Sequence, residues 1–150
     1  MLGICFDVRR DRRARASVLA ILVFAIVLSI PREARAANGA PPPGSFDARV
    51  TIAEICTLGF ARRHRRVPYR LRDAVYNRYG LRRGFRRGYV IDHLIPLELG
   101  GRNDLANLWP QSRPRSYRKD RDENRLHDAV CAGNESLADA RAEIVRLWRQ

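Results

Sequence analysis

The sequence has almost no lysine or methionine, few cysteines and no apolar run long enough to cross a membrane. Among 150 residues there are one methionine and three cysteines, and of the 29 basic residues only Lys119 is not an arginine. The longest apolar run, residues 18–30, is shorter than the roughly 20 residues that span a bilayer. No cysteine belongs to a Cys-x-x-Cys pair, which argues against a zinc site. These absences, with an apolar fraction of 45%, exclude polytopic membrane proteins and wholesale disorder.

Positive charge is what the sequence has in excess. The 29 basic residues face 16 acidic ones, which gives a formal net charge of +13. A balance this basic favours anionic partners, which are nucleic acid, an acidic membrane surface or an acidic protein. Composition alone does not choose among these three.

Residues 1–36 have the three parts of an export signal. Five arginines between residues 9 and 15 precede the apolar run, and Ala34-Arg35-Ala36 has the small-x-small pattern of a cleavage site. We expect a signal peptide cleaved after Ala36 and a periplasmic or secreted product with no stable membrane association. The alternatives are an uncleaved anchor and a start codon assigned too far upstream. Seven arginines and three acids lie in 1–36, so residues 37–150 keep 22 basic and 13 acidic groups, a net charge of +9.

The cysteines agree with export. Cys5 lies in the expected signal, which leaves Cys56 and Cys131 near opposite ends of the remaining chain. Two cysteines in a small exported domain predict one disulfide that closes a long loop and stabilises the fold by roughly 3–5 kcal/mol. The alternative is a pair of buried free thiols.

The remaining chain divides into a linker and one α+β domain. The Pro/Gly-rich stretch 37–48 predicts a flexible linker, and 49–150 a single domain. Within that domain, helices are expected from a capping box at 51–54, from Pro68 to Tyr79, over 117–130 and from Ser136 to Trp148. Residues 81–88 predict a loop, 89–91 a strand, 105–109 a return strand and 110–114 a turn. The centre is therefore a β-hairpin followed by a helix, flanked by additional helices.

The residues with the clearest chemistry lie around that hairpin. Asp92-His93 ends the first strand and sets an oxygen ligand beside an imidazole. Neighbouring strand residues point to opposite faces, so both serve one site only where the strand breaks into a loop, as Pro96 and the Gly100-Gly101 pair predict. Asn107 begins the return strand, where its amide can tie the loop and hold the imidazole in orientation.

Several motifs in order resemble small, often exported, bacterial proteins of the HNH nuclease superfamily. The shared pieces are Ile55-Cys56, Asp92-His-Leu-Ile-Pro-Leu-Glu-Leu-Gly-Gly101, Asn107-Leu-Trp-Pro110, Lys119-Asp120 with Glu123 and Leu126, and Val130-Cys-Ala-Gly133. The resemblance covers about residues 50–148. It implies a ββα-metal core, a β-hairpin and a helix around one divalent cation.

The resemblance also implies an activity and residue roles. His93 would be the general base that activates water against a phosphodiester, Asp92 a metal ligand, and Asn107 the residue that positions the loop. The cation would be Mg²⁺ or Mn²⁺, with Zn²⁺ as the alternative, and no small-molecule cofactor is expected. The expected function is a metal-dependent endonuclease that hydrolyses DNA with little sequence specificity, with RNA as a second substrate.

The sequence departs from the HNH pattern at the helix ligand. Tyr117 stands near the position where a His or Asn is usual, and a neutral phenol is a poor ligand for Mg²⁺. Asp120 or Glu123 could take this role, or the ligand is lost. Loss of the ligand would leave the alternative function, an exported module that binds nucleic acid without cleaving it. The structural alternative for both acids is that they form ion pairs with neighbouring basic residues on a solvated helix face.

Two arginine-rich segments flank the motif and predict contacts with phosphates. Such contacts give salt-dependent affinity that is largely independent of sequence. General solubility is the alternative explanation of these charges. We expect a monomer that binds DNA through eight arginines: Arg62, Arg63, Arg65, Arg66, Arg82, Arg83, Arg86 and Arg87.

Overall fold

The structure, a computed structural model, describes residues 40–149, and the expected signal peptide at 1–36 lies outside this range. The fold is α+β, with one two-stranded antiparallel sheet among helices, as the sequence predicted. Within the described range no helix is long and apolar enough to span a membrane. The elements in chain order are α3 (Ile52–Ile55), α4 (Phe60–His64), α5 (Tyr69–Arg78), the 3-10 helix η1 (Arg83–Gly88), β1 (Tyr89–His93), the 3-10 helix η2 (Leu97–Leu99), β2 (Leu108–Ser112), α6 (Arg113–Cys131) and α7 (Leu137–Trp148).

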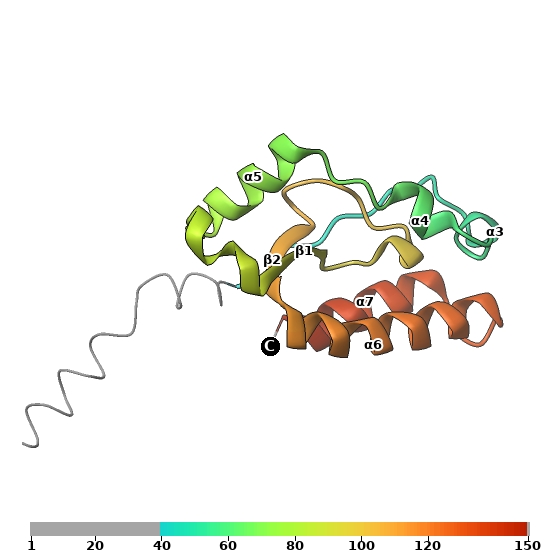
Figure 1. Cartoon of the computed structure of the whole chain (residues 1–150). Coiled ribbons are helices and arrows are strands. Elements are labelled where there is room, and N and C mark those ends of the chain that lie inside the picture. Colours follow the sequence, from blue (N-terminus) through green and yellow to red (C-terminus); the bar gives the residue numbers. More distant parts are fainter. Residues whose placement is uncertain (1–39, 150) are drawn as a thin grey trace, which may run out of the picture.

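The hairpin of β1 and β2 lies between α5 on one side and the antiparallel pair α6 and α7 on the other (Figure 1). Tyr89 pairs with Ser112 at the open end, and His93 pairs with Leu108 next to the long connection. Side chains alternate along β1, so Tyr89 and Ile91 pack against the small core cluster under α5. Asp92, the residue after Ile91, is thereby directed to the opposite face of β1, toward α6.

The second strand begins three residues later than predicted, and the predicted turn at 110–114 is absent. Residues 104–107 form a turn instead, in which the Leu108 amide donates to the Asp104 carbonyl at 2.9 Å. Pro110 lies inside β2, opposite Ile91. Helix α6 then follows without a break, because Ser112 is its N-cap residue and Pro114 falls in its first turn, where a proline costs no hydrogen bond.

The main core fills the space between η2, the α6–α7 pair and the short helices α3 and α4. Trp148 belongs to this core, and Trp109 of β2 is also buried. Along α6, the buried positions change from polar near the hairpin to apolar near α7. The main cluster consists of Ile55, Phe60, Leu94, Ile95, Leu99, Leu126, Val130, Ala140, Ile144 and Trp148.

The local signals in the sequence predicted most helix ends. Thr51 and Glu54 form the expected capping box at α3, and the Ser136 hydroxyl accepts from the Asp139 amide at the start of α7. Helix α5 has the expected limits, since Pro68 caps its start and Tyr79 its end. The expected loop at 81–88 is largely the 3-10 helix η1, and the basic cluster at 62–66 begins within α4, which was not predicted.

The stretch predicted to be a flexible linker is packed where the structure describes it. Pro42 is fully buried, and Phe46 forms an isolated antiparallel bridge with Gly101. The Gly44 amide donates to the Ala106 carbonyl at 2.7 Å, and the Ser45 hydroxyl donates to Asp104 at 2.7 Å. The prediction of a flexible linker is therefore wrong for the described residues of this stretch. They form backbone hydrogen bonds with the connection between the two strands.

The predicted disulfide between Cys56 and Cys131 is confirmed. It joins the residue after α3 to the last residue of α6, with Cα atoms 5.7 Å apart and 75 positions between them in sequence. Both cysteines are exposed, so the alternative of buried free thiols is wrong.

We expect the Cys56→Ser, Cys131→Ser double variant to unfold with a free energy about 4 kcal/mol smaller than the wild type, because the unfolded chain regains the entropy of a long loop. Urea unfolding followed by circular dichroism measures this difference. Leu58→Ser is the control, since Leu58 is 96% exposed and its loss should change stability by less than about 0.5 kcal/mol. Equal stability of the double variant and the wild type would contradict the prediction.

Candidate functional site

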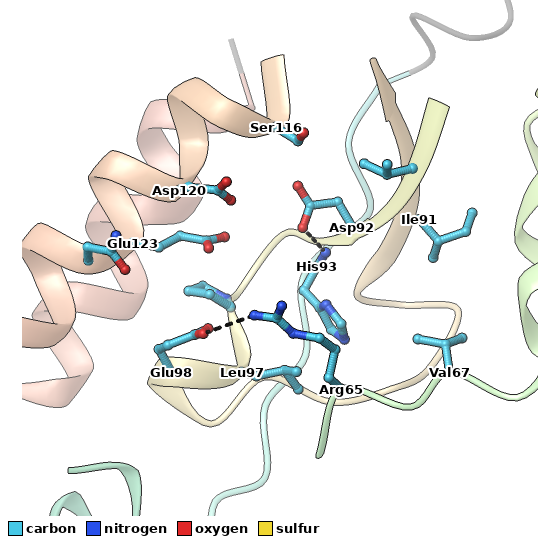
Figure 2. A pocket seen from close by; sticks show the side chains of 13 residues that line it. Arg65, Val67, Ile91, Asp92, His93, Leu97, Glu98, Ser116, Asp120 and Glu123 are labelled. Carbon is cyan, nitrogen blue, oxygen red and sulfur yellow. Dashed lines mark hydrogen bonds and ion pairs between the residues drawn. The ribbon is translucent and has the colours of Figure 1, made fainter. Parts of the chain in front are cut away.

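A pocket of about 550 Å³ opens between β1, η2 and the first half of α6. The structure brings four of the predicted catalytic and metal-binding residues to this one pocket: Asp92 and His93 from β1, and Asp120 and Glu123 from α6 (Figure 2). The helix residues reach it because 116, 120 and 123 are three or four positions apart and so share a face of α6. The rest of the lining is Arg65, Val67, Val90, Ile91, Pro96, Leu97, Glu98, Ser116 and Asn124.

Asp92 points from β1 toward α6 (Figure 2). Its Oδ1 accepts a hydrogen bond from the His93 backbone amide at 2.7 Å, which fixes the plane of the carboxylate. Its Oδ2 is buried and has no hydrogen-bond partner. A buried oxygen without a partner is unfavourable, and a cation or a donor on a ligand would remove that cost.

The two acids of α6 differ in their partners. Glu123 is mostly buried and forms a short ion pair with Lys119, whose side chain is wholly buried. Burial raises the pKa of the Glu123 carboxyl to about 7, although the Lys119 ammonium opposes this rise. Asp120 lies nearer the surface, and burial together with the negative charge of Asp92 raises the pKa of its carboxyl.

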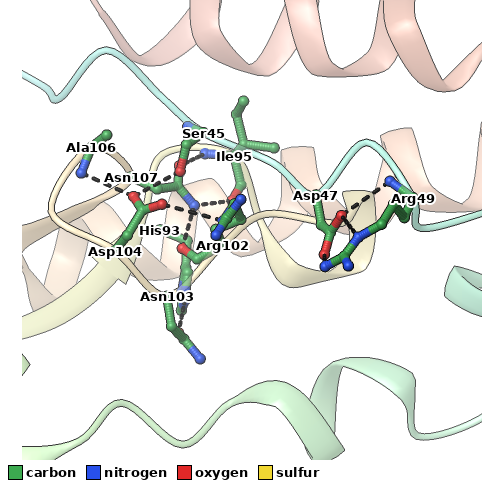
Figure 3. A network of polar contacts seen from close by, with 10 residues as sticks. All are labelled: Ser45, Asp47, Arg49, His93, Ile95, Arg102, Asn103, Asp104, Ala106 and Asn107. Carbon is green, nitrogen blue, oxygen red and sulfur yellow. Dashed lines mark hydrogen bonds and ion pairs between the residues drawn. The ribbon is translucent and has the colours of Figure 1, made fainter.

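The imidazole of His93 is held by an asparagine that the sequence analysis did not select. His93 Nε2 lies 2.7 Å from Asn103 Oδ1 (Figure 3). Asn103 Nδ2 in turn donates to the His64 carbonyl at 2.8 Å. A carbonyl only accepts, so the amide nitrogen must face His64 and the amide oxygen must face the ring. Neutral His93 therefore carries its proton on Nε2 and leaves Nδ1 basic. Burial lowers the pKa of His93 below its usual value of 6.5.

Asn107 ties the connection between the strands and does not contact the imidazole. Its Oδ1 accepts from the Ile95 amide at 2.8 Å, and its Nδ2 donates to the carbonyls of Ile95 at 2.9 Å and Arg102 at 3.0 Å (Figure 3). The side chain is wholly buried. Of the two tasks expected of Asn107, closing the loop corresponds to these contacts, whereas holding the ring falls to Asn103.

Glu98 and Arg65 face each other at the rim of the pocket. Arg65 NH2 lies 3.8 Å from Glu98 Oε1, and the arginine side chain is 74% exposed (Figure 2). This distance is too long for a hydrogen bond, and exposed ion pairs contribute little to stability. The Arg65 guanidinium is therefore free to exchange Glu98 for an anionic ligand.

Tyr117 lies apart from the other candidate ligands. Its side chain is 64% exposed and does not line the pocket. The three acids face a common pocket, but they do not form a preassembled cluster. Within residues 40–149, the one group of three metal-ligating side chains with atoms within 4.8 Å of one another is Cys56, His127 and Cys131.

Two further pockets, of about 400 and 410 Å³, continue from the first along β1 and α5. The first and second share Arg65 and Val90, and the second and third share Arg72 and Arg113, so the three lie side by side. The second and third pockets together form a depression in which positive charge dominates, because Asp73 is the only acid among their lining residues. The arginines that line the second and third pockets are Arg65, Arg66, Arg72, Arg83, Arg86, Arg87 and Arg113.

The eight arginines predicted to contact nucleic acid divide between two settings. Arg65, Arg66, Arg83 and Arg87 line the depression, whereas Arg62, Arg63 and Arg82 do not. Arg63 instead donates to the Leu58 carbonyl at 3.1 Å, and Arg82 caps η1.

Arg86 also lines the depression, but its guanidinium is already engaged. It contacts Asp73 at 2.5 Å and Asn77 at 3.2 Å, and it lies 4.5 Å above the Tyr76 ring. Arg86 therefore fixes η1 to α5 and is not available to a ligand.

Several site residues were missed by the sequence analysis. Asn103 and Glu98 stand in the connection between the strands, where nothing in the local pattern separates them from ordinary loop residues. Arg72 and Arg113 lie outside the two arginine-rich segments and join the depression only through packing. Lys119 could have been noticed in the sequence, because it is the only lysine in an arginine-rich chain. Its side chain is wholly buried and pairs with one carboxylate, that of Glu123. A guanidinium, with five donors, would leave several of them without partners at such a position.

The chain was compared with known proteins in three ways. A scan against models of protein families, a search among curated proteins and a search among solved structures each found no match.

We expect His93 to titrate below pH 6.5, and Asn103→Leu to lower its pKa further. The leucine keeps the ring buried but removes the amide oxygen, whose hydrogen bond favours the protonated ring. The pH dependence of the ring resonances in an NMR spectrum measures both values, and nitrogen shifts identify the Nε2–H tautomer. Asn134→Leu, at an exposed asparagine, is the matched control. A pKa that stays unchanged or rises in Asn103→Leu would disprove this role of Asn103.

Proposed function

We propose that the protein is a metal-dependent endonuclease of the HNH type, which hydrolyses DNA phosphodiester bonds with little sequence specificity. The observation that carries the proposal is the single pocket that Asp92 and His93 share with Asp120 and Glu123. Strand residues and helix residues meet there in the chain order of a hairpin followed by a helix. The same arrangement is what the resemblance to HNH nucleases implies for a ββα-metal core.

The residues at the pocket fit a divalent cation held by Asp92 and Asp120. Asp92 Oδ2 is buried without a partner, and burial followed by the negative charge of Asp92 raises the pKa of the Asp120 carboxyl. Hard oxygen ligands of this kind suit Mg²⁺ or Mn²⁺. Glu123 is already paired with Lys119, so it is the weaker candidate ligand. A bound cation would supply Lewis-acid stabilisation of charge on the phosphate and on the departing 3′ oxygen.

His93 supplies the base in this mechanism. At neutral pH its lowered pKa keeps the ring uncharged, and the contact with Asn103 leaves the lone pair on Nδ1. A water molecule that attacks phosphorus gives its proton to Nδ1 as the bond from phosphorus to the 3′ oxygen breaks. Asn103 keeps the ring in one tautomer and orientation, and the Arg65 guanidinium can hold a phosphate oxygen at the rim.

The arginine-lined depression supports nucleic acid as the substrate. It continues from the acidic pocket, so a polyanion bound along it would deliver a phosphodiester to His93 and Asp92. The charged side chains along this depression are arginines suited to phosphate contacts, and contacts to phosphates carry no sequence information. Little sequence specificity follows from this arrangement.

Binding without cleavage is a second candidate function, and one observation favours it. Tyr117 lies outside the pocket and Glu123 is paired with Lys119, so Asp120 is the one acid of α6 that lines the pocket without such a partner. A cation with few protein ligands binds weakly. The assay that follows separates the two functions.

We expect the purified full-length protein to nick supercoiled plasmid DNA with Mg²⁺ or Mn²⁺ and to stop when EDTA is added. Removing a general base costs about 10²- to 10⁴-fold in rate, so His93→Ala should be nearly inactive. Asp92→Asn keeps the Oδ1 acceptor for the His93 amide but loses the charge, and it should raise the concentration of metal needed for half-maximal cleavage. Gel electrophoresis of the plasmid forms measures both effects.

Tyr117→Phe is the matched control for these substitutions, because the side chain is exposed on the same helix. It should cleave within about twofold of the wild type. DNA binding without cleavage under every divalent cation would overturn the enzyme and leave the binding module.

We expect the Arg72→Gln, Arg113→Gln double variant to bind DNA more weakly and with a smaller salt dependence. Each phosphate contact contributes about 0.9 to the slope of log affinity against log salt, so the slope should fall by up to about 2. Fluorescence anisotropy with a labelled duplex at several salt concentrations measures it. Arg118→Gln with Arg121→Gln removes the same charge from exposed positions of α6 that line none of the three pockets. Equal slopes for the two double variants would contradict a specific role of the arginine-lined depression in binding DNA.

A further inference from the structure

The disulfide between Cys56 and Cys131 has a histidine beside it. His127 precedes Cys131 by four positions, one turn of α6, and its Nε2 lies 3.5 Å from Cys131 Sγ. The ligand atoms of Cys56, His127 and Cys131 all lie within 4.8 Å of one another. Both cysteines are exposed, so a reductant and a metal ion can reach them. This cluster is at the far end of α6 from the acidic pocket and is independent of the proposed nuclease function.

We propose that the reduced protein binds one Zn²⁺ ion at this cluster, through the thiolates of Cys56 and Cys131 and the imidazole of His127. Two sulfur ligands and one nitrogen ligand are a set that soft and borderline cations prefer, and a water molecule would complete a tetrahedron. The absence of a Cys-x-x-Cys pair from the sequence argued against zinc. The fold assembles the same kind of ligand set from residues 75 positions apart.

The distances suit a tetrahedral ion. With Zn–S near 2.3 Å and Zn–N near 2.0 Å, a tetrahedron places nitrogen and sulfur about 3.5 Å apart and the two sulfurs about 3.8 Å apart. The observed distance from His127 Nε2 to Cys131 Sγ is already 3.5 Å. After reduction the two sulfurs must separate, and Cys56 has room to move because it is an exposed residue beyond the end of the four-residue helix α3.

The reaction balances with a thiol reductant. Two electrons and two protons from a dithiol convert the disulfide to two thiols, and the dithiol becomes its own disulfide. Zn²⁺ then displaces one proton from each thiol and accepts the lone pair of neutral His127, so the site gains no net charge.

Asp128 can support the ligand role of the histidine. In the disulfide form His127 Nε2 lies 3.1 Å from the Ile55 carbonyl, so Nε2 carries the proton. A metal at Nε2 requires the proton on Nδ1 instead, and Asp128 Oδ1 lies 3.6 Å from Nδ1 on a side chain that is 82% exposed. Carboxylates in this position commonly fix the tautomer of metal-bound histidines.

A metal at this cluster would preserve the cross-link that the disulfide makes. Both join the end of α3 to the end of α6, so the fold would stay closed under reducing conditions as long as zinc is present. The cluster would therefore be a redox-dependent metal site, which binds metal when its cysteines are reduced and does not bind metal when they form the disulfide.

Cobalt binding tests the proposal in the full-length protein carrying Cys5→Ser, so that no third thiol contributes. After reduction with a phosphine and its removal, Co²⁺ should bind in one equivalent and give the near-ultraviolet sulfur-to-cobalt charge-transfer band with tetrahedral visible bands. The oxidised protein should give neither. Zn²⁺ should displace the cobalt and raise the thermal unfolding midpoint of the reduced protein only.

His127→Ala keeps both cysteines and the disulfide, and it should weaken cobalt binding to the reduced protein by at least about tenfold. His64→Ala removes another histidine that contacts a main-chain carbonyl, and it should bind cobalt like the parent. The proposal is overturned if the oxidised and reduced proteins bind cobalt alike, if no charge-transfer band forms, or if His127→Ala binds as tightly as His64→Ala. Cobalt held at the acidic pocket would lack the sulfur band in every variant.

Discussion

The buried amide of Asn107 holds the connection between the two strands in the shape on which the candidate site depends. This side-chain amide forms hydrogen bonds with both backbone groups of Ile95 and with the carbonyl of Arg102. The backbone carbonyl of Asn107 accepts a further hydrogen bond from the Leu94 amide at 2.8 Å. Gly101 must be a glycine for this closure, since a Cβ there would lie 1.8 Å from the Ile95 carbonyl oxygen. The closed loop places His93 at the end of β1 and carries Asn103 to its ring. An unsatisfied amide at this depth would cost about 1–3 kcal/mol, so the loop has few alternatives.

Two different electrostatic environments adjoin each other along β1. The pocket between β1 and α6 collects Asp92, Glu98, Asp120 and Glu123, whereas the adjoining depression along α5 is lined by arginines. Lys119 reduces the electrostatic repulsion among the acids of this pocket, because its buried ammonium pairs with Glu123 and compensates one negative charge. A polyanion would be attracted along the arginines and repelled at the acids. The proposed cation would turn the repulsion between the acids of the pocket and a phosphate group into attraction.

The sequence predicted the elements better than their junctions. Capping boxes, prolines and strand alternation depend on local interactions, and they located α3, α5, α7 and β1. The local pattern misplaced β2 and wrongly indicated a flexible linker over the described residues 40–48. Pro110 and the Pro/Gly stretch have backbone partners far away in the sequence, which a short window of sequence does not contain. The site follows the same division. Asp92 and His93 stand out as neighbours, whereas the contact of Asn103 with His93 exists only after Asn107 has closed the loop.

Helix α6 joins the two chemically interesting regions of the described chain, and its residues are used differently along its length. Its first half turns Ser116, Asp120 and Glu123 to the pocket, and its second half turns Leu126 and Val130 to the core before ending at Cys131. The distance between Asp92 and Asp120 is set by how α6 seats against the hairpin. That seating depends on the core and on the cross-link at Cys131, which are both remote from the pocket. Because a rigid helix transmits any tilt along its axis, the cross-link at one end constrains the carboxylates at the other.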